Sequence, residues 1–174
     1  MKYLIRLKRR KKGGTAKMNL YSHKPEGYEC PFCRIVSGKE KQNKGTKQRD
    51  IIYQNKYVTA FIASKWWPNN KGHVLVVPNE HFENIYELPA EIAAEIHSVA
   101  QLTAFALKNT YNCDGVSTRQ HNEPAGNQDV WHYHLHVYPR YQNDNLYLTK
   151  GEYTEPDERP YYAEKLRSWI KENT

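Results

Sequence analysis

The alternation of apolar and polar positions along the chain predicts several short strands. Two runs rich in β-branched and aromatic residues, 51–55 and 57–63, are divided by an Asn-Lys turn and indicate a hairpin. The apolar run 72–78 begins with Gly and ends with Pro, which is typical of a buried strand. Residues 115–122 and 130–139 predict two more strands. We therefore expect a mostly antiparallel five-stranded sheet.

Helical periodicity occurs in two stretches. Between Leu88 and Asn112, apolar residues recur three or four positions apart, and Pro89 suits the first turn of such a helix. These residues are Ile92, Ile96, Val99, Leu102 and Ala106. Residues 156–173 predict a shorter amphipathic helix at the C-terminus. Successive strands with helices on one side and at the end are typical of an α+β domain.

The length of 174 residues fits one domain with tails. We expect this domain at residues 18–174, with a core at 28–142 and a C-terminal extension at 143–174. Residues 1–17 hold eight Lys and Arg residues and no acidic residue, so this arm has a charge of +8. The net charge of the whole chain is +7, so the remaining residues sum to −1. A run of like charge predicts a disordered arm, for which we expect at most weak contact with nucleic acid. The apolar runs fall short of the roughly 18 residues that span a bilayer, so no membrane contact is expected.

The three cysteines point to a reducing compartment. Without a secretory signal they argue against a disulfide framework and for the cytoplasm. Cys113 stands alone in a turn, where an inert thiol is expected. Cys30 and Cys33 form a Cys-x-x-Cys pair, which is either a redox motif, half of a metal site, or two free buried thiols. The redox alternative lacks the βαβ context of thioredoxin-like proteins.

Three histidines, His132, His134 and His136, stand at a strict spacing of two. On a strand they share one face, which we expect to lie at a surface or cleft. The opposite face carries residues expected to pack on the core: Trp131, Tyr133, Leu135 and Val137. Imidazoles two residues apart on a strand lie about 6.5–7 Å from each other, too far for all three to ligate one metal. One imidazole acting as nucleophile or general acid/base, with the others orienting it, fits this spacing better.

The segment "QHNEPAGNQDVWHYHLHVYPR" resembles the His-x-His-x-His motif of the histidine-triad (HIT) superfamily. Upstream, "CPFCRIVSGK", "YVTAFI" and "GHVLVVPNEH" match that superfamily in order and spacing. The resemblance implies a HIT-like fold and a nucleotide hydrolase or nucleotidyl transferase, usually a homodimer. Its expected substrate is a mono- or dinucleotide attacked at the α-phosphate, such as a dinucleoside polyphosphate or a nucleoside phosphoramidate.

The resemblance also implies roles for individual residues. His134 would be the nucleophile that becomes nucleotidylated, with its second ring nitrogen held by a backbone carbonyl of the same strand. His136 and Gln128 would face the phosphate oxygens, and His73 would approach from the adjacent strand. Nucleotide-binding positions fall on Phe61 and Asn122.

Some bacterial members of the superfamily bind zinc through four residues that this chain also carries. The corresponding residues are Cys30, Cys33, His81 and His132. Two thiolates and two imidazoles make a closed tetrahedral set, so this zinc would be structural.

Four positions depart from the superfamily pattern. Ala63 stands where many members have an Asp that holds the ribose, and Asp129 replaces a Ser near the leaving phosphate. Trp66 and Trp67 occupy positions where smaller residues are frequent, either to stack a base or to cover a dimer surface. The alternative to an enzyme is therefore a catalytically weak nucleotide-binding or partner-interaction module of the same fold.

Overall fold

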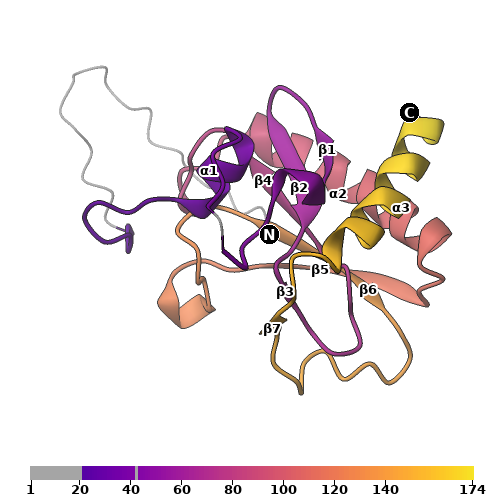
Figure 1. Ribbon diagram of the computed structural model, residues 1–174. Helices are drawn as coiled ribbons and strands as arrows, with labels where there is room; N and C mark the ends of the chain where they lie inside the picture. The colour runs from indigo at the N-terminus through magenta and orange to yellow at the C-terminus, as the bar shows by residue number, and fades with distance from the viewer. Residues whose placement is uncertain (1–20, 42) are drawn as a thin grey trace, which may run out of the picture.

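The computed structural model describes residues 21–41 and 43–174, so the basic arm at 1–17 lies outside the described residues (Figure 1). Five antiparallel strands form one sheet in the order β1-β2-β4-β6-β5. Their bounds are β1 Ile51–Gln54, β2 Val58–Ile62, β4 Val74–Pro78, β6 Leu135–Arg140 and β5 Gly115–Gln120. The predicted hairpin is β1–β2, and the predicted five-stranded sheet is confirmed.

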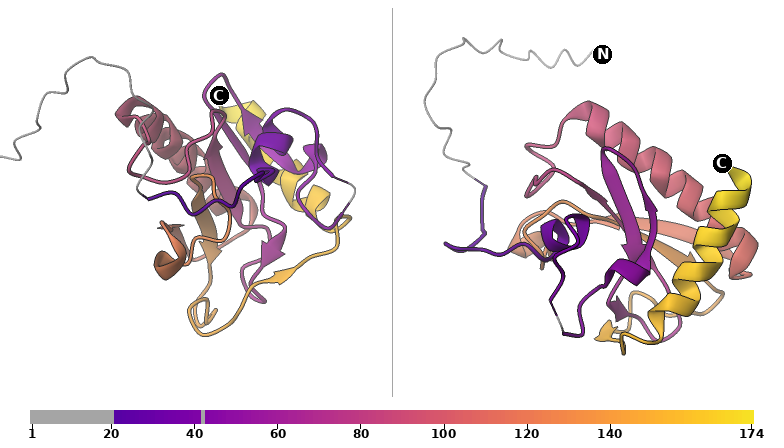
Figure 2. Two further views of the ribbon diagram at one scale, coloured as in Figure 1. Left: turned by 90° about the vertical axis from the view of Figure 1, so that its left-hand side faces the viewer. Right: turned by 45° about the horizontal axis from the view of Figure 1, so that its top comes forward.

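Two helices, α2 (Ala90–Thr110) and α3 (Arg159–Asn173), cover one face of the sheet (Figure 2). Both were predicted; Pro89, however, is the N-cap of α2 and stands one position before the first helical residue. The apolar stripe of α2, including Ile96 and Val99, packs on the inward side chains of the strands, which removes apolar surface from water. None of the described helices has the length and apolar character to cross a membrane.

The opposite face of the sheet is partly covered by a six-residue helix, α1 (Pro31–Val36). Phe32 and Ile35 of α1 pack on Phe61 and Leu75 of the sheet. Pro31 occupies the first turn, where its missing N–H costs nothing, and the Cys30 sulfur accepts a hydrogen bond from the backbone of residue 33. The helix was not predicted, because six residues are too few to display a helical period.

Strand β6 begins at Leu135, so the prediction that it begins at residue 130 was wrong. The ladder with β4 ends at the pair Val76↔Leu135. Before this point the chain leaves β4, and the Tyr133 amide donates to the carbonyl of Phe82 instead. His132 and His134 therefore precede the strand.

Two tryptophans lie elsewhere than expected. Trp131 is partly exposed beside His23, at a ring separation of 5.8 Å, and is not in the core. Trp66 is buried in the main core against Tyr162, so the expectation that it stacks a base or covers a dimer surface was wrong. Both errors have the same cause, since neither an irregular segment, at Trp131, nor a two-residue strand, at Trp66, shows a period that reports the direction of a side chain.

A second, two-stranded sheet joins the C-terminal extension to the middle of the chain. Strand β3 (Lys65–Trp66) pairs with β7 (Glu152–Tyr153). Two 3₁₀ helices, η1 (Gln48–Asp50) and η2 (Pro124–Gly126), complete the regular elements. Strand β7 places the extension beside the sheet face that carries α1 (Figure 1).

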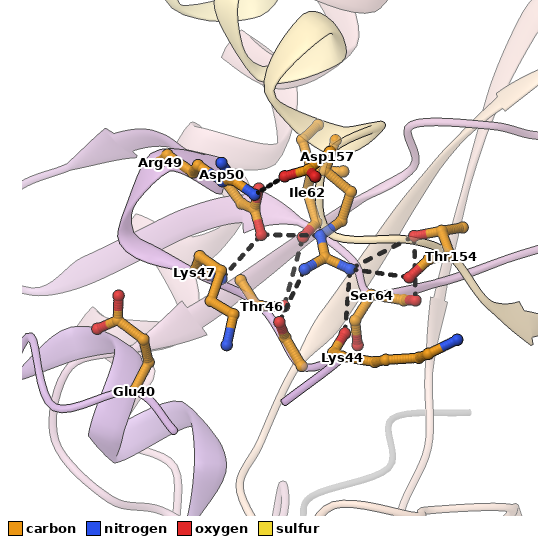
Figure 3. Close-up of polar contacts among 12 residues, drawn as sticks. Glu40, Lys44, Thr46, Lys47, Arg49, Asp50, Ile62, Ser64, Thr154 and Asp157 are labelled. Atoms are coloured by element: carbon orange, nitrogen blue, oxygen red, sulfur yellow. Dashed lines mark hydrogen bonds and ion pairs between the residues drawn. The ribbon is translucent and has the colours of Figure 1, made fainter. Parts of the chain in front are cut away.

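A fully buried ion pair fixes the start of α3. The Arg159 Nε donates to Asp50 at 2.8 Å, and both side chains are 0% exposed. The other guanidinium nitrogens donate to the carbonyls of Lys44 and Gly45 at 3.1 and 2.7 Å. In Figure 3, dashed lines join this guanidinium to Asp50 and Lys44 of the loop before β1 and to Thr154 of the C-terminal extension. The pair thus ties the C-terminal extension to the loop before β1.

We predict that Arg159→Met lowers the free energy of unfolding by about 3–5 kcal/mol, because it leaves the Asp50 carboxylate buried without its cation. Urea denaturation measures this loss. The matched control is Arg49→Met, which breaks an exposed pair with Asp157 and should cost under about 1 kcal/mol. Equal effects of the two substitutions would contradict the assignment of stability to the buried pair.

Candidate active site and metal centre

Four side chains gather their donor atoms at the start of α1. The ligand atoms of Cys30, Cys33, His81 and His132 all lie within 4.8 Å of one another. The separation is 3.3 Å from the Cys30 sulfur to His132 Nδ1, and 3.3 Å from the Cys33 sulfur to His81 Nδ1. A tetrahedral zinc with Zn–S of about 2.3 Å and Zn–N of about 2.0 Å sets sulfur and nitrogen about 3.5 Å apart. The cluster therefore fits a tetrahedral metal ion.

A backbone contact orients one of these side chains, His132. His132 Nε2 lies 2.9 Å from the carbonyl oxygen of Pro78, the last residue of β4. A carbonyl only accepts, so Nε2 carries the proton and Nδ1 presents its lone pair to the thiols. His132 is completely buried, and Phe32 packs edge-on against its ring.

The two thiols differ in acidity. The hydrogen bond from Cys30 lowers the pKa of Cys33 well below its usual range, with further lowering by His132 and His81. The same thiol–thiol contact and burial raise the pKa of Cys30. Because thiolate is the ligand form, the lowered pKa of Cys33 favours metal binding.

The remaining triad histidines line a second site, a cavity of about 200 Å³. His134 Nδ1 lies 2.8 Å from the carbonyl oxygen of His132. By the same argument as above, Nδ1 carries the proton and Nε2 holds the lone pair. His136 Nδ1 lies 3.3 Å from His73 Nε2, so β6 and the residue just before β4 each bring one more histidine to this cavity.

The cavity histidines are neutral at pH 7 because they are buried. Desolvation lowers the pKa of His134, with smaller opposing effects of the His132 carbonyl and Asp129. Burial, with a contribution from Arg119, lowers the pKa of His73 to about 3, and burial also holds the pKa of His136 well below its usual range. A neutral imidazole is the nucleophilic form.

The triad geometry differs from the predicted flat strand face. The rings of His134 and His136 are 5.0 Å apart, closer than the spacing along an ideal strand. His132 turns to the metal cluster, whereas His134 and His136 turn to the cavity. His134 is only 2% exposed, so the face is enclosed rather than open.

Gln128 has its amide group engaged by backbone. Its nitrogen donates to the carbonyls of Glu83 and Val130 at 2.6 and 3.0 Å, and its oxygen accepts from the Glu123 amide at 2.9 Å. In this arrangement Gln128 holds the loop that precedes the triad.

The other two expected nucleotide-binding residues are not among the lining residues of the cavity either. Asn122 accepts a hydrogen bond from the Ile85 amide at 2.9 Å, which joins the segment between β5 and η2 to the loop before α2. Phe61 is fully buried and supports Phe32, whose ring lies 5.5 Å away. Phe32 itself lines the cavity.

Two residues near the triad, Asp129 and Ala63, depart from the superfamily pattern. The Asp129 carboxylate pairs with Lys65 at 3.1 Å, which offsets its repulsion of a phosphate. Ala63 is buried and offers no side-chain hydrogen bond where a ribose would be held. Both residues line the cavity.

A larger groove of about 610 Å³ adjoins the cavity and was not predicted. The two hollows share four lining residues: Phe32, Ser64, Val130 and Tyr153. Tyr153 comes from β7 in the C-terminal extension, and no sequence pattern placed it near α1. The groove and the cavity therefore adjoin each other at these four residues.

Comparison with known proteins agrees with this geometry. The HIT domain family matches residues 44–143. The chain belongs to the HIT family. The protein named "Protein hit" of Bacillus subtilis is 33% identical over 112 residues, covering 64% of this chain and 71% of that protein.

Two further HIT relatives bear on the sites. The crystal structure of a zinc-bound histidine triad family protein from Mycobacterium smegmatis has a TM-score of 0.68 and 28% identity, covering 83% of this chain and 94% of its own. Adenylylsulfatase HINT3 of Arabidopsis thaliana is 25% identical over 123 residues, which are 71% of this chain and 58% of that protein.

The donor geometry predicts about one zinc ion per chain in protein purified without chelator. His132→Ala should lower both the zinc content and the midpoint of thermal unfolding, because three ligands then remain. Elemental analysis and calorimetry measure these effects. The control, Cys113→Ala, removes a buried thiol outside the cluster and should leave zinc content unchanged. A metal-free protein that is indifferent to chelator would overturn the prediction.

Proposed function

We propose that this HIT protein is a nucleotide hydrolase or nucleotidyl transferase that attacks the α-phosphate of a mono- or dinucleotide through His134. The observation that carries the proposal is the 2.8 Å contact from His134 Nδ1 to the His132 carbonyl. This contact fixes the tautomer in which Nε2 is the nucleophile, and no hydrogen bond within the described residues engages Nε2.

The reaction has two steps. Nε2 of His134 forms a bond to the α-phosphorus while the bond to the leaving group breaks, and the leaving group departs with the electron pair. Water then attacks the phosphorus, the N–P bond breaks with its electrons returning to Nε2, and a nucleoside monophosphate and a proton are released. Another acceptor in place of water makes the protein a transferase. The burial that lowers the pKa of His134 favours the first step, because attack requires an unprotonated imidazole.

The adjoining groove supports a nucleotide as the substrate. Its apolar lining at Phe32 and Ile35 suits a base, and Phe32 also lines the cavity that holds His134. The named activity of the Arabidopsis relative, an adenylylsulfatase, supports a nucleotidyl substrate as well. Dinucleoside polyphosphates and nucleoside phosphoramidates are the other candidates.

We also propose that the metal is a structural zinc and that the protein works in the reducing cytoplasm. All three cysteines of the chain are free. Two thiols of a zinc site and a buried third thiol need a compartment that prevents their oxidation.

The alternative function is a nucleotide-binding module with little activity. Ala63 and the exposed Asp129 favour it, since one removes a ribose contact and the other adds negative charge. The two functions differ in one observable, because only an enzyme of this mechanism forms a stoichiometric nucleotidyl adduct on His134.

We predict that His134→Ala lowers turnover by several orders of magnitude while the fold and nucleotide affinity persist. His136→Ala should also be costly in the parent but add little in the His134→Ala background, because the two act as one unit. Steady-state kinetics and mass spectrometry of the adduct are the measurements. His97→Ala, on the exposed side of α2, is the control and should retain activity. Comparable turnover by His134→Ala, or an adduct on another residue, would favour the binding module.

A homodimer is the proposed assembly. Strand β5 is an edge of the sheet, and the adjacent α2 leaves Phe105 56% exposed. An edge strand beside an exposed aromatic residue is a surface suited to a second copy.

We predict a mass of twice 20.5 kDa by sedimentation at micromolar concentration. Phe105→Glu should shift the equilibrium toward the single chain, because it would bury a charge in the interface. Tyr57→Glu, an equal change at an exposed aromatic on the β1–β2 turn, is the control. A single-chain mass for the parent protein would refute the homodimer.

A further inference from the structure

Arg119 lies beside the triad without being part of the mechanism described above. It stands on β5, directly opposite His136 of β6. Cross-strand partners direct their side chains to the same face, so Arg119 projects on the face that carries His136 and His73. The sequence reasoning did not single out this residue.

Three aromatic rings hold the guanidinium in place. Its central carbon lies 4.8 Å from the Tyr147 ring, 5.4 Å from the Tyr138 ring and 5.9 Å from the Trp67 ring. Tyr138 stacks on His73 at a ring separation of 4.4 Å, and Trp67 lines the cavity. Aromatic faces attract a guanidinium and leave its N–H edge free to bind. Arg119 is therefore a positioned cation at the edge of the cavity.

The charge of Arg119 is not balanced by an acid. The neighbouring Arg140 is neutralised by Asp144, with contacts of 2.6 and 2.9 Å. Among the residues that the structure describes, Arg119 forms no ion pair with a carboxylate; its recorded partners are the aromatic rings and the Tyr147 hydroxyl. Burial is the largest cause of the lowered pKa of His73, and the positive charge of Arg119 is the second largest. The electrostatic field of Arg119 therefore reaches the cavity.

Arg119 and the groove approach the cavity through different residues. The groove adjoins the cavity at Phe32, Ser64, Val130 and Tyr153. Arg119 contacts Trp67, which lines the cavity, and Tyr138, which stacks on the cavity residue His73. A nucleoside in the groove with its α-phosphate at His134 therefore places the leaving group toward Arg119.

We propose that Arg119 is the binding residue of a leaving-group subsite that selects nucleotides whose leaving group is an anion, a phosphate chain or a sulfate. This proposal rests on the function proposed above and narrows its substrate class. As the P–O bond breaks, the leaving oxygen takes the electron pair, and the guanidinium stabilises the negative charge that develops there. An amine that leaves from a phosphoramidate departs neutral after gaining a proton and receives no such stabilisation.

The test compares three substrates with one nucleoside: diadenosine triphosphate, adenosine 5′-phosphosulfate and adenosine 5′-phosphoramidate. Arg119→Met should lower kcat/KM for the first two by about 10²-fold, the loss typical of one charge-stabilising donor, and change the third little. Arg119→Lys should restore part of the loss, because charge returns without the planar fork. Lys56→Met, which removes one positive charge in the β1–β2 turn, is the control and should leave all three values unchanged.

Calorimetric titration with inorganic tripolyphosphate tests the subsite without catalysis. The parent protein should bind this anion in competition with the anionic substrates, and Arg119→Met should not bind it. Equal loss on all three substrates, or no loss on any, would overturn the proposal. Absence of turnover and of a His134 adduct would instead overturn the proposed function, while tripolyphosphate binding that depends on Arg119 would still identify the anion subsite.

Discussion

The site depends on one backbone group, the carbonyl of His132. It accepts the hydrogen bond that fixes the tautomer of His134. The imidazole of the same residue belongs to the cysteine and histidine cluster and is braced by the Pro78 carbonyl. Because the side chain of His132 is held at both ring nitrogens, its carbonyl has little freedom to turn. The cluster of potential metal ligands and the imidazole of His134 are thus linked through one peptide unit, which explains why three histidines at a spacing of two divide between two sites.

The two faces of the sheet have different roles. One face is apolar and packs on α2 and α3, so it supplies stability. The other face carries His136 of β6, with His73 just before β4 and His134 just before β6, between two different neighbours. On one side α1 covers an apolar groove, and on the other the arginines of β5 and β6 lie among tyrosines. A ligand with one apolar end and one charged end matches this order of surfaces.

Most of the fold could be predicted from the periodic spacing of apolar residues. The long amphipathic helix, the hairpin and the strand at 72–78 all followed from spacing, and the resemblance to HIT proteins brought together Cys30 and His132 across a hundred residues. What the sequence did not reveal lies where the chain is irregular. The start of β6 depends on where β4 stops pairing, and the direction of Trp66 depends on α3. Arg119 was missed because a single charged residue on a strand carries no pattern until its cross-strand neighbour is known.

The buried ion pair of Asp50 and Arg159 bears on which substitutions can change this protein. Strand β7 supplies Tyr153 to the wall of the groove, and the pair anchors the helix that follows it. The cavity histidines come from other segments and need neither residue for their own contacts. The contacts of these histidines and the shape of the groove are therefore encoded in separate stretches of the chain. Substitutions in the C-terminal extension can thus reshape the groove while the hydrogen bonds of His134 and His136 stay intact.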